Sequence, residues 1–289
     1  MSGEQVRHPA FAGQFYAGAR QSLLEQIARC YKHPLGPGHV PVIKKGKRSI
    51  KGAIVPHAGY EFSGPVAAHV YNALAEEGFP EIFIIIGPDH QHFGRKAAIT
   101  TETFRTPLGD VPVDKKLAEE TLRGGIEDDP IVHSAEHSIE VQLPFLLQLK
   151  SEIKFVPICM TSQDIETAEE VGKIIAKAIE GKDVIILAST DFTHCGPMYG
   201  QLPPKGKRAD EFAWEQDKKA IDLILKLNPE ALYDVIERHS ITMCGYGCVA
   251  TMLFALNKKA KSGELLKYAT SYEIMPGSNA VGYAGVLIK

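Results

Sequence analysis

The sequence predicts a three-layer α/β/α fold around a central sheet that is mostly parallel or mixed. Short runs of strand length, such as residues 82–86, are apolar at every position, which indicates strands buried on both faces. These runs alternate along the chain with amphipathic helical patterns. No linker-like segment divides the 289 residues into two cores, so we expect a single domain over residues 1–289.

The first elements follow from these patterns. Residues 53–55 form a short apolar strand, and a helical pattern follows over about 64–77. Residues 82–86 form the next strand. Residues 155–158 form another, and because Pro157 cannot donate a backbone hydrogen bond, we expect this strand at a sheet edge or near a strand end.

The later elements continue the alternation. Residues 165–180 place their apolar side chains on one stripe, which predicts a helix. Asp164 is placed to cap its start and Gly181 to cap its end. The Gly- and Pro-rich residues 196–207 indicate a long surface loop. The remaining strands are expected over residues 184–187, 267–272 and 284–288.

Composition limits the function classes. Lys and Arg number 32 against 35 Asp and Glu, a net charge of −3, which gives no overall attraction to nucleic acid or to an anionic membrane. No run of about 18 apolar residues suggests a membrane span, and residues 1–5 do not open a secretory leader. Five cysteines without a CxxC pair indicate reduced thiols in a cytoplasmic protein. We expect no nucleotide cofactor.

Three of the 11 histidines follow three different predicted strands. His57 follows the first strand, His90 the second, and His194 the strand at 184–187. Ligands of α/β sheets bind beyond the carboxyl ends of the strands. A single histidine at such a position is typical of a structural role, but three at matching positions predict a shared site.

The segment 134–140 adds one histidine and two carboxylates. It opens a predicted helix, and Glu136 and Glu140 are favourable near a helix N-terminus for the dipole alone. His137 is harder to explain in this way, because the same dipole disfavours a protonated imidazole. We therefore expect His137 to line the site as a catalytic candidate.

Two neutral imidazoles, one anionic ligand and open positions are typical of catalytic metal sites. Cys244 lies in a glycine-rich turn where a metal or a helix N-terminus can hold a thiolate, whereas Cys248 is expected to pack in an apolar helix. Asp191 is the other candidate for the anionic ligand. It stands three residues before His194, so it could instead orient that imidazole as a proton shuttle.

At these residues the sequence resembles the Memo family, whose fold is similar to that of the class III extradiol ring-cleaving dioxygenases of the LigB type. The resemblance covers nearly the whole chain. The motifs that carry it are HPAFAGQFY at 8–16, PHAGY at 56–60, GPDH at 87–90, FRTPLG at 104–109, EHSIE at 136–140, STDFTH at 189–194 and CG at 244–245.

The resemblance implies a LigB-like fold and a dioxygenase-like pocket. It implies that the metal ligands are His57, His90 and Cys244. It also implies that Asp191 and His194 form the supporting or base pair of the site. The expected cofactor is iron or copper, with zinc as an alternative.

Two positions depart from the related patterns. The ring-cleaving relatives have a glutamate as the anionic ligand, where this chain has Cys244. A thiolate suits copper, zinc or iron, and it disfavours catechol cleavage, which requires Fe(II) held by two histidines and a carboxylate. Asp89 stands where the family usually has Ser or Asn, so it could add negative charge beside His90 or point to solvent from a turn.

Four functions are compatible with these residues. The first is a metal-dependent oxidoreductase acting on a small molecule. The second is a binding module, because the family includes members regarded as adaptors for phosphotyrosine peptides and the same pocket could hold a peptide or a partner protein. The chain has no Arg cluster that would favour phosphate binding. The others are a zinc hydrolase and a hydrolase with Cys244 as nucleophile and His194 as base.

Overall fold

The computed structural model describes residues 5–46 and 48–289. Part of the expectation about an N-terminal leader concerns residues 1–4, which lie outside the described residues. The main sheet has the strand order β10-β12-β2-β9-β3-β8-β4-β7, and β11 pairs with β12. Its strands are β2 (Gly52–Val55), β3 (Ile82–Pro88), β4 (Ala97–Ile99), β7 (Glu127–Asp128), β8 (Lys154–Met160), β9 (Val184–Ser189), β10 (His194–Cys195), β11 (Gly263–Thr270) and β12 (Ala280–Ile288).

The centre of this sheet is parallel, and an antiparallel strand borders it on each side. β2, β9, β3 and β8 run in the same direction, whereas β12 is antiparallel to β2 and β4 is antiparallel to β8. The sheet is therefore mixed, which is one of the two arrangements that the sequence predicts. Because the parallel strands lie side by side, the residues that follow β2, β9 and β3 meet at one edge.

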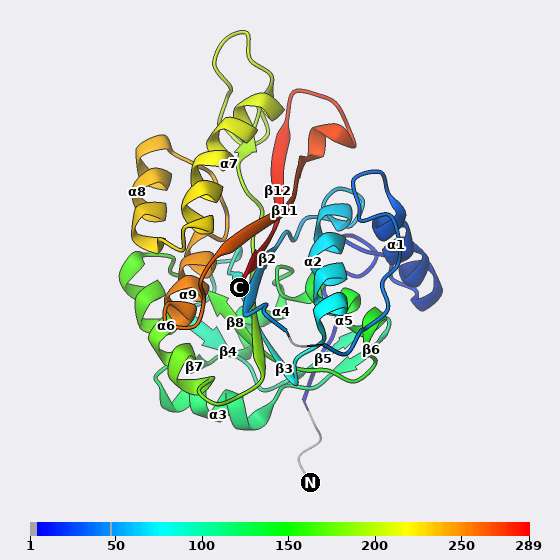
Figure 1. The fold of residues 1–289 in the computed structure, drawn as a ribbon, viewed down its shortest axis with the longest axis vertical. Helices are drawn as coiled ribbons and strands as arrows, with labels where there is room; N and C mark the ends of the chain where they lie inside the picture. Colours follow the sequence, from blue (N-terminus) through cyan, green and yellow to red (C-terminus); the bar gives the residue numbers. More distant parts are fainter. Residues whose placement is uncertain (1–4, 47) are drawn as a thin grey trace.

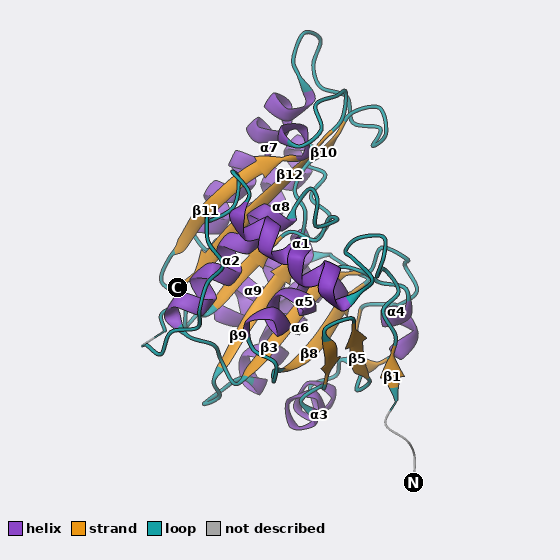
Figure 2. Cartoon of the chain, turned by 90° about the vertical axis from the view of Figure 1, so that its right-hand side faces the viewer, coloured by secondary structure: helices purple, strands orange, loops and turns teal. Residues whose placement is uncertain are grey.

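Helices cover both faces of the sheet, so the predicted three-layer α/β fold is confirmed (Figures 1 and 2). One layer contains α1 (Arg20–Lys32), α2 (Gly64–Glu77) and α5 (Leu143–Leu149). The other contains α6 (Ile165–Ala178), α7 (Ala209–Leu225), α8 (Pro229–His239) and α9 (Tyr246–Leu256). The remaining elements are α3 (Lys115–Arg123), α4 (Pro130–Ser134), the 3-10 turns Glu140–Gln142 and Ser271–Glu273, and a small sheet of β1 (Val6–Arg7), β5 (Thr103–Thr106) and β6 (Gly109–Val111).

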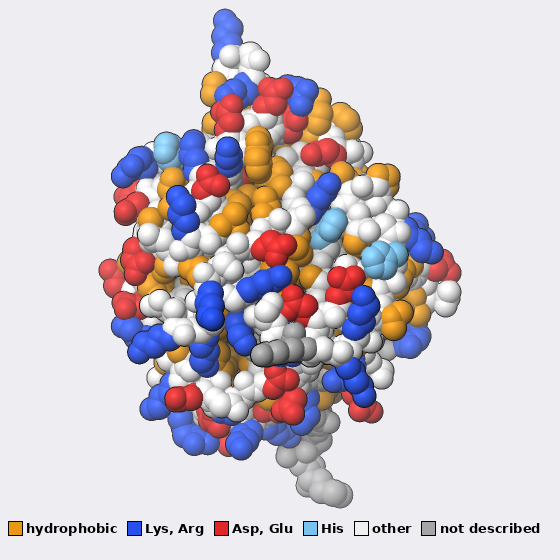
Figure 3. All heavy atoms as spheres, viewed as in Figure 1, with side chains coloured by type: hydrophobic (Ala, Val, Ile, Leu, Met, Phe, Trp, Pro, Cys, Tyr) orange, Lys and Arg blue, Asp and Glu red, His pale blue; other side chains and the backbone are white. Residues whose placement is uncertain are grey.

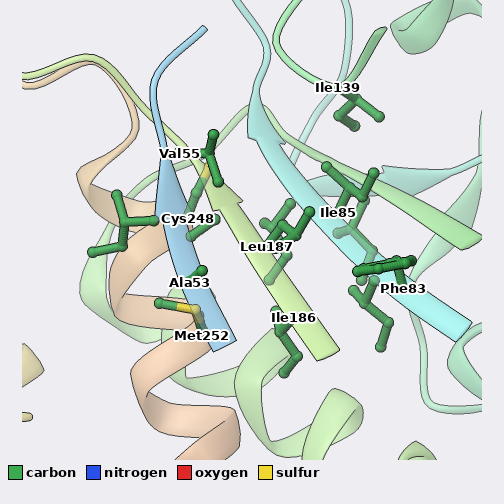
Figure 4. Packing of buried hydrophobic residues seen from close by; sticks show 14 of the residues in the cluster. Ala53, Val55, Phe83, Ile85, Ile139, Ile186, Leu187, Cys248 and Met252 are labelled. Atoms are coloured by element: carbon green, nitrogen blue, oxygen red, sulfur yellow. The ribbon is translucent and has the colours of Figure 1, made fainter. Parts of the chain in front are cut away.

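The apolar helix α9 packs closely on the parallel strands (Figure 4). Cys248 is fully buried there, which confirms that it packs in the core. At Gly52, a β-carbon would lie 2.7 Å from the Met252 sulfur. This glycine therefore permits the short distance between α9 and β2. No described helix is both long enough and apolar enough to cross a membrane.

The expectation that Pro157 marks a sheet edge or a strand end is wrong, since it stands in the middle of β8. Pro157 lies in β8, which is flanked by β3 on one side and β4 on the other. The N–H of Phe155 points to the β4 side, where it bonds the carbonyl of Pro112, and strand alternation turns the nitrogen of Pro157 to the same side. β4 pairs only as far as Ile158, so Pro157 occupies a gap in the pairing where no donor is needed.

Two predicted helix boundaries also change. Asp164 caps α6 as expected, with its carboxylate accepting from the Thr167 N–H at 2.7 Å. The helix ends at Ala178, however, and Gly181 lies beyond it in a turn with φ +71°. Residues 134–140 do not open a continuous helix, because α4 ends at Ser134 and a 3-10 turn begins only at Glu140. Residues 196–207 form the expected loop.

Candidate metal centre

The three predicted metal ligands meet at the carboxyl edge of the parallel strands. His57 follows β2, His90 follows β3, and Cys244 lies in the turn before α9. His57 Nε2 is 3.1 Å from Cys244 Sγ, and the rings of His57 and His90 have centroids 5.1 Å apart. One potential ligand atom from each residue lies within 4.8 Å of the others. This spacing is compatible with a single ion held by all three.

His57 is held from both its backbone and its ring. Its N–H donates to Asp191 Oδ1 at 2.8 Å, and its Nδ1 lies 3.0 Å from Ser189 Oγ. Burial lowers the pKa of His57 well below its usual value, and positive charge on His90 or His137 would lower it further. The imidazole is therefore neutral, as a metal ligand must be.

His90 is held by Glu136. Both the backbone N–H and Nδ1 of His90 contact the carboxylate, at 2.8 and 3.0 Å. Burial raises the pKa of Glu136, but hydrogen bonding and positive charge from His90 outweigh it and bring the pKa to about 2. Burial lowers the pKa of His90, but hydrogen bonds to Cys244 and Glu136 outweigh it and raise the pKa to about 10. His90 is therefore protonated without a metal, and it must release a proton when a metal binds. A carboxylate on the ring nitrogen opposite the metal is typical of metal-binding histidines.

The function of Glu136 was missed at the level of sequence. The helix dipole that accounted for it does not apply, because Glu136 lies in the irregular segment after α4. Its partner His90 is 46 residues away, and no local spacing signals such a pair. Only the fold brings the two residues together.

Cys244 lies in a turn that several polar groups hold in place. The N–H of Asp191 points to its Sγ at 3.3 Å. Gln163 bonds the Cys244 carbonyl at 2.7 Å and accepts from the Gly247 N–H at 2.9 Å. Burial raises the pKa of the Cys244 thiol, and the hydrogen bond with His90 lowers it in part. A bound metal ion would favour the thiolate form of this side chain.

His137 lines the site as expected, although from a turn rather than from a helix N-terminus. Its ring stacks on His90 with centroids 4.5 Å apart and planes 24° apart. The rings of Phe15 and Phe11 also contact the His137 ring, with centroid distances of 4.5 and 5.2 Å. Burial lowers the pKa of His137 to about 4, so the ring is neutral. The two phenylalanines belong to the N-terminal segment, whose role at the site was not predicted.

The prediction that Asp191 orients His194 is wrong. The Asp191 carboxylate accepts from the N–H groups of His57 and Ala58, at 2.8 and 3.3 Å. His194 Nδ1 lies 3.0 Å from the carbonyl of Thr242, which can only accept, so Nδ1 carries the proton and donates. Asp191 therefore supports the turn at His57. Thr242 supports His194, whose ring contacts that of Tyr199 at a centroid distance of 5.2 Å.

Asp89 combines parts of both expectations. It is a turn residue, but its carboxylate is buried rather than solvated. It accepts from the N–H groups of Gln91 and Gly94 and from the Thr161 hydroxyl, at 2.8 to 3.1 Å. These bonds shape the loop that carries His90. Of the histidines without a predicted role, His133 is buried and bonds the Ala98 carbonyl at 3.1 Å, which is a structural contact.

Fold and site together define an α/β protein in which two imidazoles and one thiol converge beyond the ends of parallel strands. A sequence profile described as Memo-like protein matches residues 7–287. The chain is 42% identical to a MEMO1 family protein of Methanopyrus kandleri, over 98% of this chain and 99% of that protein. It is 40% identical to one of Methanothermobacter thermautotrophicus, over 96% and 99%. The chain belongs to the Memo-like protein family.

A solved structure supports the fold independently. An uncharacterised protein of Escherichia coli K12 superposes with a TM-score of 0.55 at 14% sequence identity. The match covers 83% of this chain and 100% of that one. At this identity the likeness concerns the α/β fold alone.

Proposed function

We propose that His57, His90 and Cys244 bind one redox-active metal ion, iron or copper, and that the protein is an oxidoreductase acting on a small molecule. The observation that carries this proposal is the convergence of the three potential ligand atoms within 4.8 Å. Ser189 and Glu136 occupy the Nδ1 atoms of the two histidines, so Nε2 is the ring nitrogen left for a metal.

The donor set fits such an ion. Imidazole suits iron, copper and zinc, and a thiolate disfavours magnesium and calcium. When bound, the ion would supply one-electron chemistry. The surrounding residues have separate tasks: Glu136 strengthens His90 as a ligand, the neutral His137 can accept a proton, and Phe15 shields His137 from water.

A cavity lined in part by Tyr199, whose ring contacts His194, supports a small organic or peptide ligand. It has a volume of about 450 Å³ and is lined by Phe62, Met275 and Tyr283, among others, a size typical of ligand pockets. Tyr199 belongs to the same lining, and its ring contacts His194 at a centroid distance of 5.2 Å. We propose that substrate enters here and that His194 moves a proton on this side.

Metal analysis tests the proposal. Protein purified without added metal, and protein titrated anaerobically with Fe(II) or Cu(I), should contain one equivalent of iron or copper. His57→Ala and Cys244→Ala should lose it while retaining the circular dichroism of the folded chain. Cys248→Ala is the matched control, because it removes a buried thiol four residues away that faces the core. Retained binding in both ligand variants would refute the site, and stoichiometric zinc would favour a hydrolase.

One contact favours a second candidate, a cysteine nucleophile. Cys244 Sγ lies 3.1 Å from His57 Nε2, which is the distance expected for a thiol and its base. The pKa of this thiol is raised by burial, however, whereas a nucleophile needs it lowered. Alkylation of the metal-free protein with iodoacetamide separates the two, because a catalytic thiolate reacts quickly at neutral pH and a buried thiol does not.

The remaining proposals concern partners and location. A phosphotyrosine peptide titrated with and without chelator tests the peptide-binding alternative, and binding that a chelator does not affect would favour it.

The five cysteines are all free, and a thiolate ligand requires a reducing environment. We therefore propose that the protein works in the cytoplasm.

A further inference from the structure

We infer that Ser189 and Gln142 are positioning residues that hold His57 in the tautomer protonated on Nδ1. Its Nε2 lone pair is then directed toward Cys244. Ser189 is the last residue of β9, and Gln142 ends the 3-10 turn before α5. This inference deepens the proposed metal site and rests on it for its functional meaning.

The hydroxyl of Ser189 has three partners. Its Oγ lies 2.6 Å from the Ser138 carbonyl oxygen, 2.8 Å from Gln142 Nε2 and 3.0 Å from His57 Nδ1. A carbonyl oxygen can only accept, so the single hydroxyl proton points to Ser138. The two lone pairs of Oγ then face Gln142 and His57, and both of these groups must donate.

The orientation of the Gln142 side chain is fixed in turn. Its Nε2 atom is also 3.1 Å from the carbonyl oxygen of Pro56. Its Oε1 atom lies 2.6 Å from the Tyr71 hydroxyl. If the amide were rotated, its oxygen would face the carbonyl of Pro56 without a proton between them. Gln142 therefore donates to Ser189. The Ser189 oxygen can only accept from His57, so the proton of the neutral imidazole lies on Nδ1.

The consequence lies on the opposite side of the ring. A neutral imidazole carries one proton, so a proton on Nδ1 leaves Nε2 with a free lone pair. Nε2 is the atom 3.1 Å from Cys244 Sγ. The other tautomer would place a proton where a metal must bind. Ser189, Gln142 and His57 are each at most 2% exposed, so water cannot readily replace any member of this network.

The tautomer can be measured directly in metal-free protein. Long-range nitrogen–proton correlation spectra of the reduced, chelator-treated chain with ¹⁵N-labelled histidine distinguish protonated from unprotonated ring nitrogens, and His57→Gln identifies the His57 signals. We expect Nδ1 protonated and Nε2 unprotonated. The opposite result in the unmodified protein would overturn the inference by itself.

Three substitutions test the cause. Ser189→Ala removes the acceptor, and His57 should become a mixture of tautomers. Gln142→Leu leaves the Ser189 hydroxyl free to rotate, so a smaller shift in the same direction is expected. Thr121→Val is the control: it removes a buried hydroxyl in α3 that bonds the Ala118 carbonyl and lies outside this network, so the tautomer should not change. If Ser189→Ala keeps a pure Nδ1–H tautomer, Ser189 does not determine it.

Metal affinity gives a second readout. Ser189→Ala should weaken metal binding by about 10- to 100-fold, as loss of a group that orients a ligand does elsewhere, and Thr121→Val should leave binding unchanged. Equal affinities for the unmodified protein and Ser189→Ala would overturn the positioning role. If the unmodified chain shows the expected tautomer but binds no metal, the proposed function fails and the tautomer assignment stands.

Discussion

Arg7 and Glu140 form a buried ion pair that fastens the N-terminal segment to the site. The Arg7 guanidinium also donates to the carbonyls of His133 and Glu136, at 3.0 and 2.8 Å. Glu140 additionally accepts from the Tyr16 hydroxyl and from backbone N–H groups of the segment that carries Phe11. One pair of charges therefore positions both Glu136 and the aromatic residues over His137.

Arg7→Met tests how much this ion pair contributes to the stability of the fold. It leaves the buried Glu140 without its cation, which typically costs about 3–5 kcal/mol of the free energy of unfolding. Urea unfolding followed by circular dichroism measures the loss. Adding Glu140→Gln should recover part of it, because the uncompensated charge is then gone. If the double variant lost as much free energy of unfolding as the two single variants together, the two residues would act independently.

Glu136→Gln removes the charge next to His90 and retains nearly the same shape. Metal affinity should fall by about 10- to 100-fold, as measured by competition with a chromophoric chelator. Glu170→Gln serves as control, since Glu170 pairs with Lys96 on the exposed surface. An unchanged affinity in Glu136→Gln would mean that the carboxylate has only a structural role.

Asp217 makes stability depend on pH. Burial raises its pKa to about 7, and hydrogen bonds from Thr193 and Tyr268 only partly offset this. Because the folded value lies above the unfolded value of about 4, its contribution is present below pH 4 and is lost as the pH rises toward 7. His133 acts in the opposite direction, since burial lowers its pKa to about 4. It reduces stability as the pH falls below about 6.5.

The difference between the unmodified protein and Asp217→Asn isolates the first effect. The stability of the variant relative to the unmodified chain should rise between pH 4 and 7, by at most about 1.4 kcal/mol per pH unit. Urea unfolding at several pH values measures it. A constant difference across this range would show that Asp217 titrates normally in the folded protein.

Met252→Ala tests the packing of α9 on β2. Met252 is fully buried, and its truncation should cost about 2–5 kcal/mol of the free energy of unfolding. Metal stoichiometry should remain at the level of the unmodified protein, because Met252 lies among the buried core residues of α9 and β2 (Figure 4). Loss of metal with little loss of stability would contradict this separation of core and site.

The surface in Figure 3 shows acidic and basic side chains interspersed over the face viewed there, in keeping with the near balance of 32 positive and 35 negative residues. The features of the chain that matter for function lie elsewhere, at the ends of its buried strands. The sequence predicted the types of residue at these strand ends, but it did not predict their hydrogen-bond partners.

The sequence by itself determined the α/β fold, because strand and helix periodicity and burial on both faces are local patterns in the chain. It also singled out His57, His90 and His194, because strand ends of a parallel sheet meet at one edge, whereas Cys244 was selected as a ligand by the resemblance to the Memo family. Only the tertiary structure decided which carboxylate supports which histidine. Asp191 holds the His57 turn rather than His194, and Glu136 holds His90. Such pairs join residues 46 and 134 positions apart, and a hydrogen bond over that separation depends on the packed geometry rather than on local spacing.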